Sequence, residues 1–380
     1  MTNNSVDVVI VGGGLAGLAS AIHLSKLGVP TLVIEKHTYP RHKVCGEYLS
    51  YEVVPYLNFL GIDLVALGAK KINRLLISTA KSKAIETQLP LGGYSISRHT
   101  LDYTLSEKVK ANGGTIFHDT VLSIEFIQNS FKIKTKGNIE YQAKVVIGAF
   151  GKRSNLDASL DRFFLKKKSP LLAVKTYLKG DFPDDLVALH NFNGGYCGVS
   201  KVETNHMNVC YMTDFKSFQK FNNFNDFQQN VLCQNDYLKT IFENSEPVLS
   251  KPLTISQISF SSKNSVENHI MMCGDSAGMI HPLSGNGMSM AIHSAQMVST
   301  LIEEYLLEKI NSRSALEQMY VTMRRKAFKK RLIAGRYIAP FFGMNIFSEL
   351  LMAGLQSFPK ILPKIIEQTH GKLELPENPK

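Results

Sequence analysis

The chain has 380 residues, 44% of them hydrophobic, so it can bury a large core and form two or three domains. Its 43 Lys and Arg residues exceed its 32 Asp and Glu residues, and the formal net charge of +11 suits contact with an anionic membrane surface or with anionic cofactors. The basic residues do not alternate with aromatic residues along one motif, so no nucleic-acid binding is expected. The five cysteines lack CxxC spacing, which argues against a disulfide framework and against a metal site.

No segment is expected to cross a membrane. The first apolar run, residues 6–11, is far shorter than a membrane span, and no basic segment typical of a secretion signal precedes it. We therefore expect a cytoplasmic protein. The apolar tail, residues 331–380, contains Pro340, Pro359 and Pro363, which predicts short helices. Peripheral membrane contact explains its apolar residues, and a cap folded over a substrate cavity explains them equally well.

The first 36 residues predict a βαβ unit. Residues 6–11 are apolar and β-branched, the following GGGLAGLASAIHLSKLG carries apolar residues at helical spacing, and residues 31–36 form a second apolar run. A helix is predicted for residues 99–113, where two glycines close it. Four short strands are predicted at residues 115–118, 121–127, 131–135 and 139–147.

Beyond residue 170 the pattern changes to short β-rich segments, with a polar helical stretch at 215–243. Strand residues return at 269–275, and apolar residues at helical spacing predict a helix from Met288 to Glu308. The predicted fold class is α/β (α+β overall), with a Rossmann-like three-layer domain, an inserted β-sheet substrate domain and a helical C-terminal cap. The predicted boundaries are 1–70, 95–165 and 265–330 for the first domain, 71–94 and 166–264 for the second, and 331–380 for the cap.

A glycine motif, Gly12-x-Gly14-x-x-Gly17, follows the first predicted strand and opens the helix. Gly12 permits a tight turn, Gly14 lets the backbone approach a pyrophosphate, and Gly17 allows close packing of helix and strand. The helix N-terminus offers N–H groups to phosphates, and Glu35 at the end of the next strand can accept from ribose hydroxyls. A glycine turn in an unrelated α/β sheet is the alternative. The predicted dinucleotide contacts here are Gly12, Gly14, Leu15, Ala16, Gly17, Glu35 and Lys36.

The segment IMMCGDSAGMIHPLSGNGMSMAI, residues 270–292, selects FAD as the dinucleotide. It resembles the second FAD-binding motif of the superfamily of flavin monooxygenases and geranylgeranyl reductases, which has the para-hydroxybenzoate hydroxylase fold. The resemblance implies that Asp275 accepts from the ribityl hydroxyls and that the following loop and helix face the isoalloxazine. A helix N-terminus there stabilises negative charge on the reduced flavin. The implied contacts are Gly274, Asp275, Gly285, Asn286, Gly287 and Met288.

Two further segments resemble this superfamily. SISRHTLDYTL at 95–105 is similar to a helix start whose arginine, here Arg98, lies near the cofactor. YPRHKVCGEYLS at 39–50 is similar to the reductase segment that carries a Cys-Gly pair beside the flavin, here Cys45 and Gly46. Arg41 is a further candidate FAD contact, and Cys45 is the candidate catalytic residue. Ion pairs for the two arginines and a packing role for Cys45 remain alternatives.

The chain also departs from the superfamily pattern. Phe150-Gly151 stands where most relatives have Asp-Gly, which argues against direct use of NAD(P)H and favours a protein electron donor. Gly274-Asp275-Ser276-Ala277-Gly278 is closer to the reductases than the Gly-Asp-Ala-Ala-His of typical hydroxylases. The chain has no tryptophan, so the Trp-x-Trp signature of the flavin halogenases is absent and halogenation is not expected.

These features predict an FAD-dependent oxidoreductase that acts on an apolar small molecule, with NAD(P)H as a candidate electron donor. The first hypothesis, from Cys45-Gly46 and the Asp275 segment, is geranylgeranyl-reductase-like reduction of a C=C bond in an isoprenoid or polyene. The alternatives are a monooxygenase acting on an aromatic, quinone or polyketide substrate, and a flavin electron-transfer protein without small-molecule turnover. His281 is interpreted as a structural residue of its loop before a catalytic acid.

Overall fold

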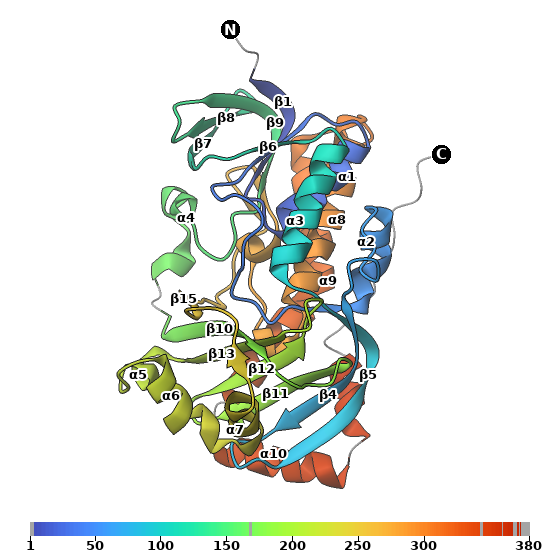
Figure 1. Ribbon diagram of the computed structural model, residues 1–380. Coiled ribbons are helices and arrows are strands. Elements are labelled where there is room, and N and C mark those ends of the chain that lie inside the picture. The colour runs from blue at the N-terminus through green and yellow to red at the C-terminus, as the bar shows by residue number, and fades with distance from the viewer. Residues whose placement is uncertain are drawn as a thin grey trace.

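The computed structural model describes residues 4–166, 169–342, 345–358, 360–367, 371 and 373 of the chain. Two β-sheets lie one above the other, and long helices stand beside the upper sheet (Figure 1). The described chain passes between the two sheets more than once, because strands of the lower sheet come from residues 48–95 as well as from residues 171–256. The observed fold class is α/β, as the sequence predicts.

The first sheet is built around the N-terminal strand, whose residues Val8, Val9 and Ile10 are fully buried. Burial on both faces is typical of a parallel sheet covered on both sides. Its strands lie in the order β16 (Val266–Glu267), β17 (Ile270–Met272), β9 (Glu140–Gly148), β1 (Ser5–Val11), β2 (Thr31–Ile34) and β6 (Thr115–Phe117). The strands from β17 to β6 are parallel, and an antiparallel hairpin of β7 (Val121–Ile127) and β8 (Ser130–Thr135) extends from β9.

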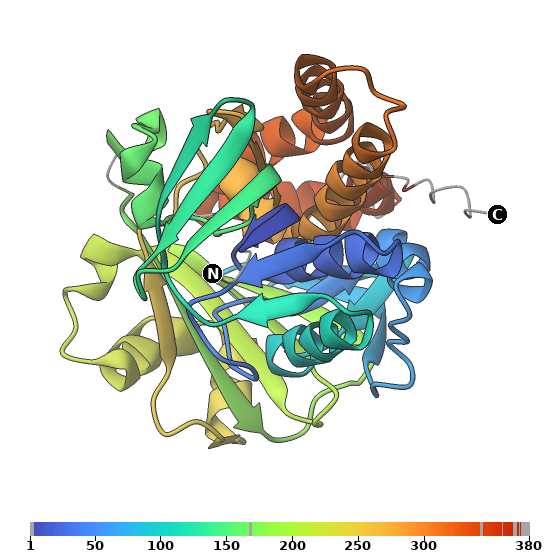
Figure 2. The ribbon, with the colours of Figure 1, turned by 90° about the horizontal axis from the view of Figure 1, so that it is seen from above.

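Helices cover one face of the first sheet. They are α1 (Leu15–Lys26), α3 (Arg98–Ala111), α8 (Gly287–Leu306) and α9 (Arg313–Phe342). The view from above shows the teal α3 and the orange α8 on either side of the blue α1 (Figure 2). The hairpin β7–β8 and the short helix α4 (Asn155–Ser159) pack on the opposite face, where a second apolar cluster lies. The result is the three-layer arrangement that the βαβ pattern predicts.

The second sheet is mostly antiparallel and lies below the first. Its strands lie in the order β14 (Glu246–Pro247), β10 (Leu171–Lys179), β13 (Met207–Asp214), β12 (Gly195–Lys201), β11 (Leu186–Phe192), β4 (Lys70–Ser78), β5 (Ala84–Ser95) and β3 (Tyr48–Ser50), with β15 (Leu253–Ser256) paired to β10. The pair β11–β4 is parallel, and it joins strands from the two separate stretches of chain. The alternation of side chains along β10 sends Leu172 and Val174 to one face and Ala173 to the other.

Helices cover both faces of the second sheet. On the face away from the first sheet lie α5 (Phe215–Phe218), α6 (Phe224–Asn230) and α7 (Asp236–Glu243), which contribute aromatic side chains to an apolar cluster. On the other face, α10 (Asn345–Ser357) and α11 (Ile361–Glu367) pack against strands β4, β5 and β11. The remaining helices are α2 (Val54–Phe59) and the 3-10 turns η1 (Tyr51–Val53), η2 (Phe163–Lys166), η3 (Leu232–Gln234), η4 (Gly274–Ala277) and η5 (Pro282–Ser284).

Two expectations for helices need correction. The helical stretch at 215–243 is divided into α5, α6 and α7, because Asp214, Asn223 and Asn235 each cap a new helix start with their side chains. The tail does not consist only of short helices, because α9 runs through Pro340 to Phe342. A proline this close to a helix end removes one hydrogen bond without ending the helix. Pro359 lies outside the described residues.

Candidate active site

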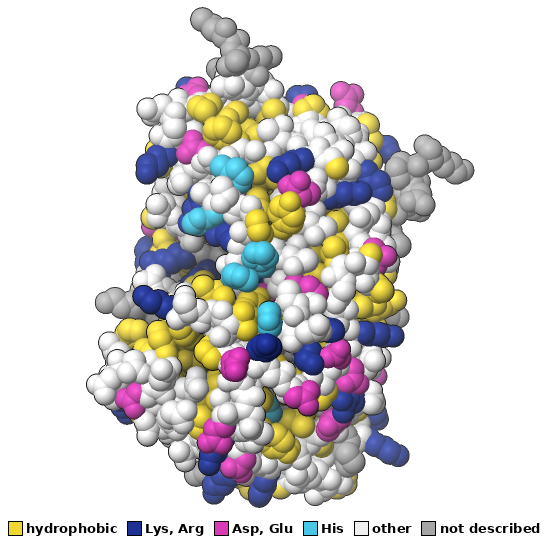
Figure 3. All heavy atoms as spheres, in the orientation of Figure 1, with side chains coloured by type: hydrophobic (Ala, Val, Ile, Leu, Met, Phe, Trp, Pro, Cys, Tyr) yellow, Lys and Arg dark blue, Asp and Glu magenta, His cyan; other side chains and the backbone are white. Residues whose placement is uncertain are grey.

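A cavity of about 780 Å³ lies between the two sheets and is the candidate site. The glycine turn after β1 and the segments at residues 35–48 and 273–291 line one end, and strands β4, β10, β11, β12 and β13 line the other. Histidine, lysine and arginine side chains gather on the face of the molecule that Figure 3 shows, where the surface is hollowed between the upper and lower halves. The lysine and arginine side chains of the cavity wall, among the described residues, are Lys36, Arg41, Lys43, Arg98, Lys152, Arg153 and Arg331.

The glycine turn brings the backbone of β1 and α1 to the cavity. Gly12 has φ of +106°, and a Cβ there would lie 2.4 Å from the carbonyl oxygen of Ala149. A Cβ on Gly17 would lie 2.0 Å from the carbonyl oxygen of Gly12, so α1 can pack this closely only with glycine at that position. Gly14 has no atom within 4 Å of its Cβ position. Helix α1 starts here with no side-chain cap and no acidic residue in its first turn.

Glu35 at the end of β2 is buried and holds the glycine turn. Its carboxylate accepts from the backbone N–H of Gly13 at 2.7 Å and of His37 at 3.0 Å. Arg41 donates to the same carboxylate at 3.3 Å, and its side chain is 29% exposed. Both residues also line the cavity. Arg41 therefore forms the ion pair considered as the alternative, and it also lines the cavity where FAD is predicted to bind.

The turn after β17 places Gly274 and Asp275 opposite the glycine turn. Ser294 of α8 accepts from the N–H of Gly274 at 2.9 Å, and the buried Arg162 donates to the carbonyl of Ser276 at 2.8 Å. Lys263 donates to the carbonyl of Asp275 at 2.9 Å. Within the described chain, the carboxylate of Asp275 has no hydrogen bond, and burial raises its pKa while Lys263 lowers it. The turn thus holds the Asp275 carboxylate in place as a hydrogen-bond acceptor to which no group of the described chain donates.

The loop before α8 ends in a second uncapped helix start at the cavity. Gly285, Gly287 and Met288 line the cavity, and α8 has neither a side-chain cap nor an acidic residue in its first turn. His281 is buried, and its Nδ1 accepts from the N–H of Leu283 at 3.3 Å. Burial lowers the pKa of His281 to about 4, so the ring is neutral at neutral pH. These contacts support the structural role expected for His281.

Arg98 starts α3 and lies at the cavity wall, mostly buried. Its guanidinium makes two hydrogen bonds to the carboxylate of Asp102, at 2.7 and 2.8 Å. Lys43 pairs with the same carboxylate at 2.6 Å. Burial by itself raises the pKa of Asp102, but Arg98 and Lys43 together hold it below its usual value. Burial lowers the pKa of Lys43 to about 8. Arg98 is therefore a fixed, paired cation beside the cavity.

Cys45 and Gly46 line the cavity, and a buried charge network lies directly behind them. Glu47 has φ of +56° and is fully buried, as is Lys175 of β10, and the two form an ion pair at 2.5 Å. The hydroxyl of Tyr177 donates to Glu47 at 2.8 Å. Asn208 donates to the carbonyl of Cys45 at 3.2 Å. Strands of the second sheet thus fix the Cys45 segment over the cavity.

Sequence reasoning did not identify this network or the lysines near Asp275. Lys152 lines the cavity and donates to the carbonyl of Ser256, and burial lowers the pKa of Lys152 to about 8. Burial has the same effect on Lys263, which lies over the ring of Phe164. The sequence feature that could have indicated Lys152 is the basic pair Lys152-Arg153, which directly follows Phe150-Gly151. Phe150 lines the cavity.

The predicted FAD contacts come together from four separate stretches of chain. The predicted residues that line the cavity are Gly12, Gly14, Leu15, Ala16, Glu35, Lys36, Arg41, Cys45, Gly46, Arg98, Gly274, Asp275, Gly285, Gly287 and Met288. Gly17 lies behind the turn against Gly12, and Asn286 is buried under the loop, where its carbonyl accepts from Met290 at 2.9 Å.

Residues 5–333 match the model of the FAD binding domain family. The chain belongs to this family. This flavoprotein is an FAD-dependent oxidoreductase.

Individual relatives of the flavoprotein are distant. Conditioned medium factor receptor 1 of Dictyostelium discoideum is 21% identical over 82% of this chain and 66% of its own length. Menaquinone reductase of Mycobacterium tuberculosis is 22% identical over 81% of this chain and 79% of its own. Digeranylgeranylglycerophospholipid reductase of Methanococcus vannielii is 23% identical over 86% of this chain and 84% of its own. The flavin-dependent brominase Bmp2 superposes with a TM-score of 0.78 at 18% identity, over 96% of this chain and 93% of that one, which shows a shared fold.

The residues of the flavoprotein fit FAD. Two helix N-termini without caps, those of α1 and α8, offer unpaired N–H groups to the anionic parts of a ligand in one cavity. Open space at Gly14 leaves room for a phosphate, and the Asp275 carboxylate is free to accept from ligand hydroxyls. The basic side chains of the cavity wall oppose the negative charge of a pyrophosphate.

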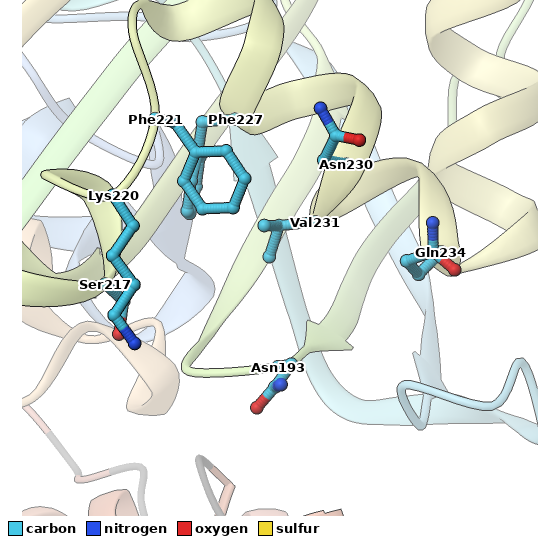
Figure 4. A pocket seen from close by; sticks show the side chains of 8 residues that line it. All are labelled: Asn193, Ser217, Lys220, Phe221, Phe227, Asn230, Val231 and Gln234. Carbon is cyan, nitrogen blue, oxygen red and sulfur yellow. The ribbon is translucent and has the colours of Figure 1, made fainter.

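A smaller cavity of about 330 Å³ lies on the opposite face of the second sheet, next to α5 and α6 (Figure 4). Phe221 and Phe227 form its apolar wall, and Asn193, Asn230 and Gln234 bring amide groups to its rim. Lys220 is the one ionisable side chain among the described residues that line it. The described residues that line this cavity therefore include no acid, thiol or histidine that could act as a catalytic group, in contrast to the cavity between the sheets.

Proposed function

We propose that the flavoprotein reduces a carbon–carbon double bond in an apolar isoprenoid or polyene. The observation that carries this proposal is the apolar end of the cavity, where aliphatic side chains of the second sheet and of α11 line the wall. That end is lined by Leu75, Ile77, Leu89, Val187, Leu189, Leu362 and Ile366. The relatives named as menaquinone reductase and digeranylgeranylglycerophospholipid reductase support the same chemistry.

The reduction needs a hydride for one carbon of the double bond and a proton for the other. When bound, FAD in its reduced form supplies the hydride. The protein residues hold the alkene in the apolar end, keep bulk water away and deliver the proton. Cys45 is the proposed proton donor, because its thiol lies in the cavity wall on a segment fixed by Glu47 and Lys175.

We expect Cys45→Ser to lower double-bond reduction at least about a hundredfold, because a hydroxyl is a far weaker acid than a thiol. FAD content should stay unchanged, since the serine keeps the size of the side chain. Cys233→Ser is the control, because Cys233 lies in η3 on the far side of the second sheet. Equal turnover of Cys45→Ser and the native chain would reduce Cys45 to a packing residue.

The direct test is anaerobic. The purified holoprotein is mixed with NADPH and then NADH, and bleaching of the oxidised flavin absorbance is followed. The protein, reduced with dithionite where neither nicotinamide bleaches the flavin, is then given a geranylgeranyl lipid and, separately, a menaquinone with an unsaturated side chain. We expect a product that has gained two hydrogens by mass spectrometry. A product that gains an oxygen atom once air is admitted would identify a monooxygenase instead, and the absence of any product after full flavin reduction would support an electron-transfer protein.

Phe150 bears on the electron donor. Because this aromatic side chain stands where the superfamily resemblance implies an aspartate, we propose that a protein donor reduces the flavin. Bleaching by dithionite but not by NADPH or NADH is the expected result. Rapid bleaching by either nicotinamide cofactor would show direct hydride transfer and would overturn this part of the proposal while leaving double-bond reduction intact.

A further inference from the structure

Helices α10 and α11 carry apolar side chains on two faces. One face is covered, since Met352, Leu355 and Leu362 are buried against the second sheet. The other face is uncovered in the described chain, and we name it the C-terminal apolar face. Its exposed fractions are Leu350 68%, Leu351 38%, Phe358 65%, Ile361 46% and Ile365 42%. Five large apolar side chains exposed within residues 350–365, with Phe358 in the connection between the two helices, mark an interaction surface.

This face adjoins the apolar end of the cavity. Leu362, Ile365 and Ile366 of α11 line the cavity, so α11 is the wall between the cavity and the outside at this end. Ile365 belongs both to the cavity wall and to the C-terminal apolar face. A lipid chain that passes between the cavity and the outside at this end therefore stays in contact with apolar side chains throughout.

The charges around the face favour an anionic partner. Lys360 and Lys364 are exposed within and beside α11, and Glu367 is the exposed acid of the same helix. Lys83 from the turn between β4 and β5 reaches Glu349 of α10 at 3.6 Å, and the lysine side chain is 56% exposed. Two copies of this face would bring these lysines together, which disfavours self-association. Exposed apolar side chains beside lysines are typical of helices that lie on a membrane surface.

We propose that the C-terminal apolar face docks on the surface of an anionic lipid bilayer and that a lipid substrate enters the cavity past α11. The part of this proposal that concerns the substrate rests on the proposed function, while the docking itself does not. Among the described helices, none has the length and hydropathy needed to cross a bilayer. The chain is therefore expected to lie on the membrane and to bind it reversibly.

The test uses the full-length FAD-loaded protein and sedimentation with vesicles. One set of vesicles is made of phosphatidylcholine alone and the other of phosphatidylcholine with phosphatidylglycerol. The native chain should bind the second set more tightly and lose binding as salt is added. The variant Leu350→Ser/Phe358→Ser should bind anionic vesicles at least about tenfold more weakly than the native chain, because it removes the two most exposed apolar side chains of the face.

The matched control is Phe163→Ser. Phe163 in η2 is 69% exposed, close to the 65% of Phe358, but belongs to the connection after α4. Its vesicle binding should equal that of the native chain, and thermal unfolding should show that both variants stay folded. A native chain that does not sediment with anionic vesicles overturns the proposal. So does a variant that binds vesicles normally but changes from dimer to monomer in analytical ultracentrifugation, because the face is then a protein interface.

Failure of docking and failure of the proposed reaction give different results. Double-bond reduction is measured on a short, water-soluble isoprenoid alcohol as well as on a geranylgeranyl lipid in vesicles. If docking is correct, the Leu350→Ser/Phe358→Ser variant loses turnover of the vesicle substrate and keeps turnover of the soluble one. Vesicle binding without any double-bond reduction would reject the proposed reaction and leave docking supported.

Discussion

At the scale of single residues, we expect Asp275 to have the most direct role in the candidate site. Its half-buried carboxylate lies at the cavity without a hydrogen bond from the described protein, and partial burial raises its pKa. A carboxylate kept in this state is costly unless a ligand donates to it. Lys263 and Ser294 hold the turn through its backbone, which leaves the side chain free for the ligand.

We expect Asp275→Ala to weaken FAD binding about 10- to 100-fold, the range for a lost hydrogen bond to a charged group. Titration of apoprotein with FAD, followed by flavin fluorescence, measures the change. Asp181→Ala is the control, because Asp181 is exposed and remote from the cavity. A variant that retained full flavin content would contradict the role assigned to this motif.

We expect Lys152 to contribute to a pH dependence of FAD binding. Burial lowers its pKa to about 8, so the free protein loses this positive charge as pH rises through about 8. An anionic phosphate binds the protonated form better, and FAD affinity should therefore fall about tenfold between pH 7 and pH 9. In Lys152→Gln the affinity should be lower at pH 7 and fall less steeply to pH 9, where Lys43 of the cavity wall still loses its charge. Lys110→Gln, at an exposed position of α3, should keep the native profile.

At the scale of elements, the contact of β1 with α1 depends on two glycines that act differently. Gly17 is needed for packing, because a Cβ there meets the Gly12 carbonyl at 2.0 Å. The fold itself does not require glycine at position 14, because its Cβ position is open and its backbone, with φ of −86°, suits any residue, so we expect Gly14 to matter for the ligand. The same motif therefore combines a structural and a ligand-binding requirement.

Alanine at each glycine should separate the two requirements. Gly17→Ala should lower the free energy of unfolding of the apoprotein by about 1 to 3 kcal/mol, because α1 must move away from the turn. Gly14→Ala should leave that free energy within about 0.5 kcal/mol of native and weaken FAD binding at least about tenfold. Urea unfolding of the apoproteins and FAD titrations provide the two readings. Equal destabilisation by both substitutions would show that the turn tolerates no side chain at all.

At the scale of the whole molecule, histidines are buried in several parts of the fold. Burial lowers the pKa of each of four side chains from the usual 6.5 to about 4. They are His23 of α1, His190 of β11, His281 before η5 and His293 of α8. The unfolded chain binds protons at these rings below pH 6.5, whereas the folded protein does not.

The FAD-loaded protein should therefore lose stability as pH falls from 6.5 toward 4. The loss has an upper limit of about 3 kcal/mol per histidine over this window. Urea unfolding at several pH values between 6.5 and 4.5 measures how steeply the free energy of unfolding falls with pH. The variant His190→Gln should reduce this slope by the contribution of about one bound proton. A free energy of unfolding that stays constant over this window would show that the rings are protonated in the fold.

The local elements and the glycine motif could be predicted from the sequence, because their signals act over a few residues. The apolar run at 6–11 and the helical spacing after Gly14 predict β1 and α1, and two-residue alternation predicts the hairpin β7–β8. The Asp275 segment indicated FAD by resemblance, and the family match supports that cofactor. Phe150 was recognised as a departure from the same pattern.

Only the tertiary structure brought together groups that are distant in the chain. Glu47 and Lys175 form an ion pair although 128 positions separate them in the sequence, and no sequence pattern around either residue predicts this pairing. Lys152 reaches the Asp275 turn because β9 and β17 are neighbours in the sheet. The sequence left open whether the apolar tail covers the cavity or faces outward. In the structure Ile365 of α11 lines the cavity and is also partly exposed on the outer surface. Periodicity reveals which residues can be buried, but sheet topology and helix packing decide against which partners they are buried.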